Sequence, residues 1–221
     1  WQVLVDESTR YFNEVYQLLG VLLIDDDIMG ESAYHHLLPD VVSRLNEQGL
    51  LKNSDGADVV FPGGHLNRDG EPLPLIVRKG DGGYNYATTD LACIIDRVER
   101  LEVDDLLYVV GTPQSRHFEM VFSVAYQAGL LNESNTTVHV NFGSVLGKDG
   151  KVLKSRSGSA VKLVDLLKES VSRANDVIGD KNPNLTGIER EDIAKAIGIG
   201  AVKYADLSTD RTRDYMFDWT R

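Results

Sequence analysis

The first 75 residues alternate between helical stripes of apolar side chains and short apolar runs. Two stripes have helical spacing: Val5, Phe12, Val15, Tyr16 and Leu19 in the first, and Leu37, Leu38, Val41, Val42 and Leu45 in the second. They predict two helices, which we expect to end at Gly20 and Gly49. The runs at 21–24 and 58–61 predict short strands, and the Gly- and Asp-rich stretch at 62–70 predicts a loop.

Strands and helices alternate regularly from residue 76 to residue 165. Apolar runs at 75–78, 106–110 and 138–142 predict strands, and the extended stretch at 84–86 is expected to lead into a helix capped by Thr88. The helical stripes are Leu91, Ile94, Ile95 and Val98, then Phe118, Val121, Phe122 and Ala125, with a stop at Gly129. Such alternation is typical of a parallel sheet, so the fold class is α/β.

The last 56 residues are predicted to be helical. One stripe contains Leu166, Leu167, Val171 and Ala174, and a second contains Ile193, Ile197 and Ala201. The pattern separates four regions: 1–24 and 25–75 with helices and short strands, 76–165 with alternating strands and helices, and 166–221 with helices.

Net charge, cysteine content and the length of apolar runs argue against several classes of protein. The chain has 34 acidic and 23 basic residues among 221, and a net charge of -11 argues against a strong non-specific nucleic-acid binder. The lone Cys93 cannot form an internal disulfide, which favours a reducing compartment. We find no apolar run long enough for a membrane span and no secretory signal. Since the chain starts at Trp1, we expect a fragment of a longer protein.

Two turns follow strands at the edge where ligands bind in open α/β folds. The first carries Tyr86, at the expected strand end, and Asp90, in the expected first helical turn. The second carries Gln114 and His117. Asp90 could face a cationic ligand or only complement the helix dipole, and Tyr86 and His117 could be structural.

Two charged segments are further candidates. The stretch 147–162 concentrates lysine and arginine among glycine and serine, which suits phosphate binding or a solvated loop, although it lacks a Walker A pattern. The acidic triplet 25–27 has no partners at metal-ligand spacing, which favours a turn or cap. No histidine or cysteine cluster has zinc spacing.

Taken together, these segments resemble arginyl-tRNA synthetase, a class I aminoacyl-tRNA synthetase. The similar motifs are MGES followed by Tyr34 (29–34), KGDGGYNYATTDLA (79–92), YVVGTPQSRHF (108–118), HVNFGSVLGKDGKVLKSRSG (139–158), GAVKYADLS (200–208) and DYMFDW (214–219). The resemblance implies the second half of a Rossmann-like parallel-sheet catalytic domain with a KMSKS-type loop (76–165). It also implies part of a connective insertion (1–75) and a helical stem-contact-like junction (166–221).

The family activates arginine with ATP to arginyl-adenylate and transfers it to the 3′ end of tRNA. The resemblance therefore implies tRNA(Arg), L-arginine and ATP as partners, with Mg²⁺ accompanying ATP on unassigned protein ligands. It implies a cytoplasmic enzyme of protein biosynthesis, with neither membrane nor DNA as a partner. No HIGH-type motif is present, nor are the terminal tRNA-binding domains, so we expect this fragment alone to be inactive.

Carried over residue by residue, the resemblance gives three groups. It implies that Tyr86, Asp90 and Gln114 bind arginine, that His117, Asn141, Phe142, Gly143 and Val145 bind ATP, and that Lys154, Ser155 and Arg156 form the catalytic loop over the triphosphate. The loop departs from KMSKS, since Ser155 stands at its second lysine position, and Gly80 replaces a frequent lysine.

Two alternatives to this interpretation stay open. One is a related nucleotidyltransferase that activates a different carboxylate, and Asp90 discriminates because arginine recognition needs an anion there. The other is a non-catalytic binding module built on half of a Rossmann-like fold.

Overall fold

The computed structural model describes residues 1–147, 150, 152 and 162–216. They form two compact units, Ile28–Phe142 and a second that joins Trp1–Asp27 to the chain from Gly143 onward. This grouping by contacts differs from the predicted regions 1–75, 76–165 and 166–221, which stay a prediction. No helix within the described ranges combines the length and apolar character of a membrane span.

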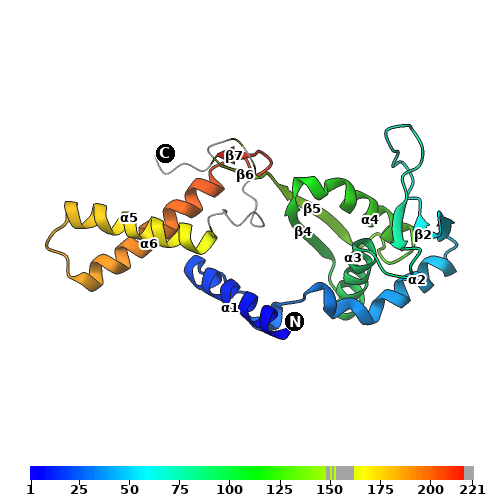
Figure 1. Ribbon diagram of the computed structural model, residues 1–221, viewed down its shortest axis with the longest axis horizontal. Helices are drawn as coiled ribbons and strands as arrows, with labels where there is room; N and C mark the ends of the chain where they lie inside the picture. The colour runs from blue at the N-terminus through cyan, green and yellow to red at the C-terminus, as the bar shows by residue number, and fades with distance from the viewer. Residues whose placement is uncertain (148–149, 151, 153–161, 217–221) are drawn as a thin grey trace. The chain divides into compact units, whose positions relative to one another are not determined.

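The unit Ile28–Phe142 contains two sheets and the helices packed on them (Figure 1). Its helical elements are η2 (Glu31–Leu37), α2 (Leu38–Glu47), α3 (Tyr86–Ile95), the π-helical η3 (Asp96–Arg100), η4 (Thr112–Gln114) and α4 (Ser115–Gln127). Its strands are β1 (Lys52–Ser54), β2 (Ala57–Val60), β3 (Leu75–Arg78), β4 (Asp105–Gly111) and β5 (Thr136–Phe142).

The pair β4 and β5 confirms the predicted parallel arrangement. The strands run in register from Asp105 opposite Thr136 to Gly111 opposite Phe142, and α4 is the helix that connects them. Successive side chains of a strand point to opposite faces of the sheet. Tyr108 on β4 is accordingly buried against α4, while the neighbouring Leu107 is exposed. The carboxyl ends of both strands therefore meet at one edge.

Strand β3 does not join that parallel pair, contrary to the expected sheet. It runs antiparallel to β2, and the sheet order is β1-β2-β3. A parallel connection needs a crossover of a dozen or more residues, usually a helix. The segment between β2 and β3 contains no helix and folds as turns, so the chain reverses.

Helix α3 differs in its first turn from the sequence prediction. Asn85 caps the helix, and its side-chain oxygen accepts a hydrogen bond from the Tyr86 backbone N–H at 2.9 Å. Thr88 is not the cap, because its buried hydroxyl donates to the carbonyl oxygen of Val77 in β3. Tyr86 is consequently the first residue of a helix rather than a strand end, and Asp90 lies in the second turn.

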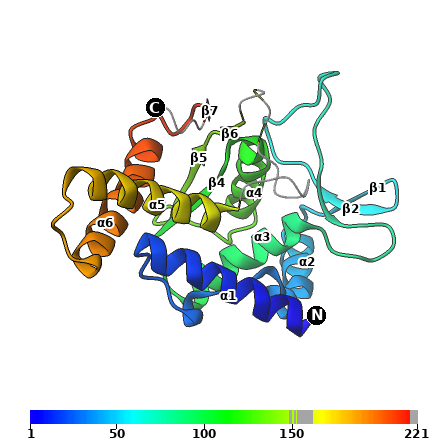
Figure 2. The ribbon, with the colours of Figure 1, turned by 60° about the vertical axis from the view of Figure 1, so that its left-hand side comes forward.

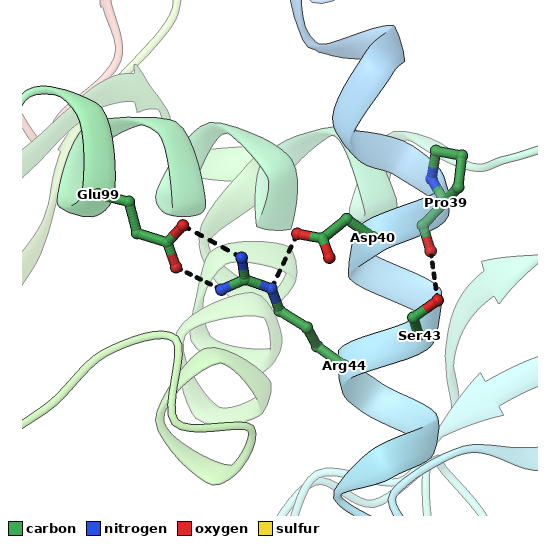
Figure 3. A network of polar contacts seen from close by, with 5 residues as sticks. All are labelled: Pro39, Asp40, Ser43, Arg44 and Glu99. Atoms are coloured by element: carbon green, nitrogen blue, oxygen red, sulfur yellow. Dashed lines mark hydrogen bonds and ion pairs between the residues drawn. The ribbon is translucent and has the colours of Figure 1, made fainter.

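An exposed ionic network ties α2 to η3 (Figure 3). The Arg44 guanidinium donates from Nε to Asp40 at 2.8 Å and contacts both carboxylate oxygens of Glu99. Ser43 Oγ donates to the carbonyl oxygen of Pro39 at 3.2 Å within α2. Because these side chains face solvent, the network contributes to orientation more than to stability.

In its described residues, the other unit has three long helices and one small pair of strands. Its elements are α1 (Gln2–Leu19), η1 (Asp25–Asp27), β6 (Val145–Leu146), α5 (Leu163–Lys181), α6 (Gly187–Leu207) and β7 (Tyr215–Met216). Helices α5 and α6 form a hairpin, α1 lies beside α5 (Figure 2), and β6 pairs with β7 in parallel. Thr186 and Glu189 form a capping box that starts α6.

Three predictions for this unit need correction. The run at 21–24 is exposed and forms no strand, since nothing pairs with it among the described residues. The segment after α6 leads to β7 rather than continuing as helix. The helix around Ile193 and Ile197 is confirmed, but these residues are 39% and 52% exposed, and α6 packs through Ala194, Gly198 and Ile199 instead.

Candidate functional site

Three side chains from the predicted site converge in the unit Ile28–Phe142. His117 Nε2 lies 2.6 Å from Asp90 Oδ2, and the rings of Tyr86 and His117 are 4.7 Å apart between centroids. Asp90 and Tyr86 come from α3, one turn apart, whereas His117 is the third residue of α4. The cluster places a carboxylate beside an exposed aromatic ring, an arrangement that suits a cation with a planar surface.

Local sequence explains why these side chains meet. The Asn85 cap and the Thr88 hydrogen bond fix the start of α3, while Ala87 and Leu91 are buried in the core of the unit. Asp90 is thereby left on the partly open side of the helix. On α4, the buried Phe118 anchors the first turn, so that the preceding His117 turns toward α3.

Gln114, the third residue predicted to bind arginine, is the N-cap of α4. It lies three residues before His117, and its side chain is exposed. Residues three apart on a helix lie on nearly the same face. The position is compatible with a shared site, and the role of Gln114 stays a prediction.

A layer of buried polar groups beside the cluster was missed by sequence reasoning. The Arg97 guanidinium lies 4.9 Å from the centroid of the Tyr108 ring, and the Tyr108 hydroxyl is buried with no hydrogen-bond partner in the described part of the chain. Burial raises the pKa of Tyr108 to about 12 and that of the Cys93 thiol to about 11, partly offset by Arg97. Both groups are neutral at pH 7, and both sense the Asp90 charge.

The signal for Tyr108 was present in the sequence. It lies within the apolar run 106–110 that predicts a strand, and the structure places it on the face of β4 where Leu106 is buried and Val110 half-buried. A tyrosine on the buried face of a strand brings a polar hydroxyl into the interior, where it is costly unless paired. Arg97 follows the apolar stripe of α3 and gave no such signal.

The carboxyl edge of the parallel strands carries two of the residues predicted to bind ATP, Asn141 and Phe142. Thr112 Oγ1 donates to the carbonyl oxygen of Phe142 at 2.9 Å, and Asn141 Nδ2 donates to Thr112 Oγ1 at 3.3 Å. These bonds join the end of β5 to the turn that precedes α4. Their place at the sheet edge suits ligand binding, and contact with a nucleotide stays a prediction.

Gly143 and Val145 belong to the other unit. The Gly143 N–H donates to Arg211 O at 2.7 Å, and the following Ser144 N–H donates to Asp214 Oδ1 at 2.6 Å. A Cβ on Gly143 would collide with the backbone of Arg213, so glycine is required for this close approach. The backbone N–H groups of Gly143, a residue predicted to bind ATP, and of the following Ser144 are thus engaged within the chain.

Other candidates give a mixed outcome. Lys154, Ser155 and Arg156 lie outside the described residues. In the acidic triplet, Asp27 accepts a hydrogen bond from the Ile24 N–H at 2.8 Å and Asp25 accepts one from Asn13 at 2.9 Å, as expected of a turn. Across the described positions, no group of three or more His, Cys, Asp or Glu side chains could hold a metal ion.

Two hollows lie apart from the convergent side chains. One, of about 480 Å³, is lined by Lys52, Phe61, Glu71 and Pro72. The other, of about 430 Å³, is lined by residues of α1 and by the segment that ends at Asp26. Neither contains a residue of the predicted arginine site.

Comparison with known proteins identifies the family. The family model described as "tRNA synthetases class I (R), catalytic domain" matches residues 1–219. An arginine–tRNA ligase of Thermobifida fusca (strain YX) is 50% identical over 221 residues, which is 100% of this chain and 38% of that protein. One from Serratia proteamaculans (strain 568) is 47% identical over 219 residues, 99% of this chain and 38% of that protein.

A solved structure supports the same assignment. The crystal structure of arginyl-tRNA synthetase from Plasmodium falciparum matches with a TM-score of 0.82 and 28% identity, over 99% of this chain and 35% of that one. The chain thus spans 38% of the length of the curated relatives named above. The resemblance inferred from the motifs is confirmed: this chain belongs to the family of class I tRNA synthetase (R) catalytic domains.

Proposed function

We propose that the protein containing this chain is an arginine–tRNA ligase. It activates L-arginine with ATP to give arginyl-adenylate and pyrophosphate, and then transfers the arginyl group to the 3′ end of tRNA(Arg). Membership of the family supports the reaction class. The observation that carries the arginine assignment is the convergence of Asp90, Tyr86 and His117 at one partly open surface.

Arginine recognition follows from the chemistry of these groups. The Asp90 carboxylate pairs with the guanidinium through charge-assisted hydrogen bonds, which a planar guanidinium can make in pairs. Lysine, a compact point charge, cannot reproduce that geometry. The exposed Tyr86 ring offers a flat surface and a hydroxyl, and Gln114 adds an amide donor and acceptor.

The nucleotide is assigned to the sheet edge and the loop beyond it. Asn141, Phe142, Gly143 and Val145 contact ATP. Lys154 and Arg156 neutralise charge on its phosphates, and Ser155 offers them a hydroxyl. Mg²⁺ enters with ATP. Regions 1–75 and 166–221 act as the connective insertion and as the junction toward the tRNA-binding domains, in a cytoplasmic enzyme. This chain alone is inactive because the HIGH-type motif is absent from it.

The test is Asp90→Asn in the full-length protein. The substitution keeps the size of the side chain and removes its charge, so we expect the KM for arginine in tRNA charging to rise by about a hundredfold or more. The KM for ATP should stay within about twofold. An unchanged KM for arginine would instead favour an enzyme that activates another carboxylate.

A further inference from the structure

The contacts of His117 place it on the amino-acid side of the site. The resemblance predicts this residue beside the nucleotide. Its ring, however, contacts Asp90 at 2.6 Å and stacks on Tyr86 at 4.7 Å between centroids, so both residues proposed to read arginine touch it. Its third neighbour, the buried Phe118, holds the ring from the core side at 5.2 Å.

The three residues of the cluster differ in how far they are exposed to solvent. The His117 side chain is 11% exposed, the Asp90 side chain 27%, and Tyr86 59%. A ligand that approaches from solvent therefore meets the tyrosine and the carboxylate, with the histidine behind them. His117 is placed to act through Asp90 rather than to touch the substrate.

The hydrogen bond identifies a nitrogen of the His117 ring that carries a proton. An ionised carboxylate only accepts hydrogen bonds, so His117 Nε2 carries the proton and donates it to Asp90 Oδ2. The donated hydrogen bond orients the carboxylate beside Tyr86. A lysine or arginine in the same place would bring a positive charge that competes with the guanidinium.

We propose that His117 is a positioning residue for arginine specificity: as a hydrogen-bond donor to Oδ2, it holds the Asp90 carboxylate beside Tyr86 with Oδ1 available to the substrate guanidinium. The proposal rests on the proposed function and deepens it. It assigns to the start of α4 a role in amino-acid selection, in addition to any role of the neighbouring strand edge in nucleotide binding.

The experiment compares amide substitutions of different reach in the full-length protein. In His117→Gln the side-chain amide nitrogen can occupy the place of Nε2, whereas in His117→Asn it is one atom short. We expect His117→Gln to keep the KM for arginine within about threefold, and His117→Asn to raise it about tenfold, because one hydrogen bond to a charged group is lost. The KM for ATP should stay within about twofold in both.

A third variant separates the ring contact from the hydrogen bond. His117→Phe keeps an aromatic ring against Tyr86 but has no donor, so its KM for arginine should rise as in His117→Asn. Melting temperatures show whether each variant is folded, and the Gln–Asn comparison stands if the Phe variant is not. The proposal is overturned if Gln and Asn behave alike, or if the KM for ATP rises and that for arginine does not.

Asp90→Asn in the same assay distinguishes a failure of the proposed function from a failure of the role proposed for His117. If it leaves the KM for arginine unchanged, the proposed function itself fails. If it raises that KM while His117→Asn does not, arginine recognition stands and only the role of His117 is wrong.

Discussion

Gly198 of α6 lies so close to Val171 of α5 that a Cβ atom on the glycine would be 2.7 Å from the Val171 Cα. The carbonyl oxygen of Gly198 also accepts a hydrogen bond of 2.8 Å from the buried Ser170 hydroxyl. Close packing of two helix backbones thus replaces the apolar stripe that the sequence predicted for α6.

Gly198→Ala should therefore destabilise the helical hairpin by about 1–3 kcal/mol, because the new methyl group meets backbone that cannot move aside independently. Gly200→Ala is the matched control, since a Cβ there meets nothing within 4 Å. It should stabilise the helix by about 0.5–1 kcal/mol. Urea denaturation followed by circular dichroism measures both, and equal effects of the two alanines would contradict the close packing.

Tyr108→Phe should leave the free energy of unfolding unchanged or raise it by about 1 kcal/mol, because the hydroxyl it removes is buried without a partner in the described structure. Tyr126→Phe provides the comparison, since the Tyr126 hydroxyl donates to the carbonyl oxygen of Asn135 at 2.7 Å. Losing that bond should cost about 1 kcal/mol. A larger loss at position 108 than at 126 would mean that the Tyr108 hydroxyl is paired.

Cys93 should resist alkylation in the folded protein. The residue is 7% exposed, and burial raises the pKa of its thiol to about 11, so the reactive thiolate is scarce at pH 8. Reaction with iodoacetamide is expected to be at least about a hundredfold slower than in denaturant. Mass spectrometry of the tryptic peptide gives both rates, and rapid labelling under native conditions would be inconsistent with this burial.

Asp96 should make stability depend on pH in the acid range. The Arg100 hydrogen bonds, at 2.6 and 2.8 Å, lower the pKa of this buried carboxyl in the folded state. A depressed folded-state pKa gives stability that is fully present above the unfolded value, about 3.9, and is lost as pH falls below that value through the folded-state pKa. Asp96→Asn should lower the free energy of unfolding at pH 7 by about 1 kcal/mol and flatten its fall in acid.

An exposed pair on α1 serves as the control for that measurement. Glu7 and Arg10 also form an ion pair, but both side chains are largely exposed to solvent. Glu7→Gln should therefore leave the pH profile of stability nearly unchanged. If the two variants flatten the profile equally, burial of Asp96 is not the cause.

The sequence was most informative where short-range patterns decide the structure. Apolar periodicity located α3, α4, β4 and β5, and motif resemblance identified the family. The start of α3 was predicted wrongly, because the sequence offers both Asn85 and Thr88 as caps. Only the hydrogen bond from Thr88 to Val77 in β3 decides between them. The prediction misplaced β3 because strand pairing depends on tertiary contacts.

The residues of the candidate site could be predicted from the sequence, but the contacts between them could not. Asp90, Tyr86 and His117 were named from spacing and resemblance, yet the bond between Asp90 and His117 joins positions 27 residues apart on two helices. Such a contact depends on how α3 and α4 pack, which periodicity does not encode. The same holds for Arg97 over Tyr108.

Helix α3 packs against β3, against α2 and against α4, and seven of its ten residues are buried. A helix held on so many sides cannot detach while the rest of the unit stays folded. Its backbone amides should exchange with solvent only through global unfolding of the unit, as native-state hydrogen exchange would reveal. The Asp90 carboxylate therefore keeps its position until the whole unit unfolds. Selectivity for the amino acid should stay constant on heating up to the melting temperature.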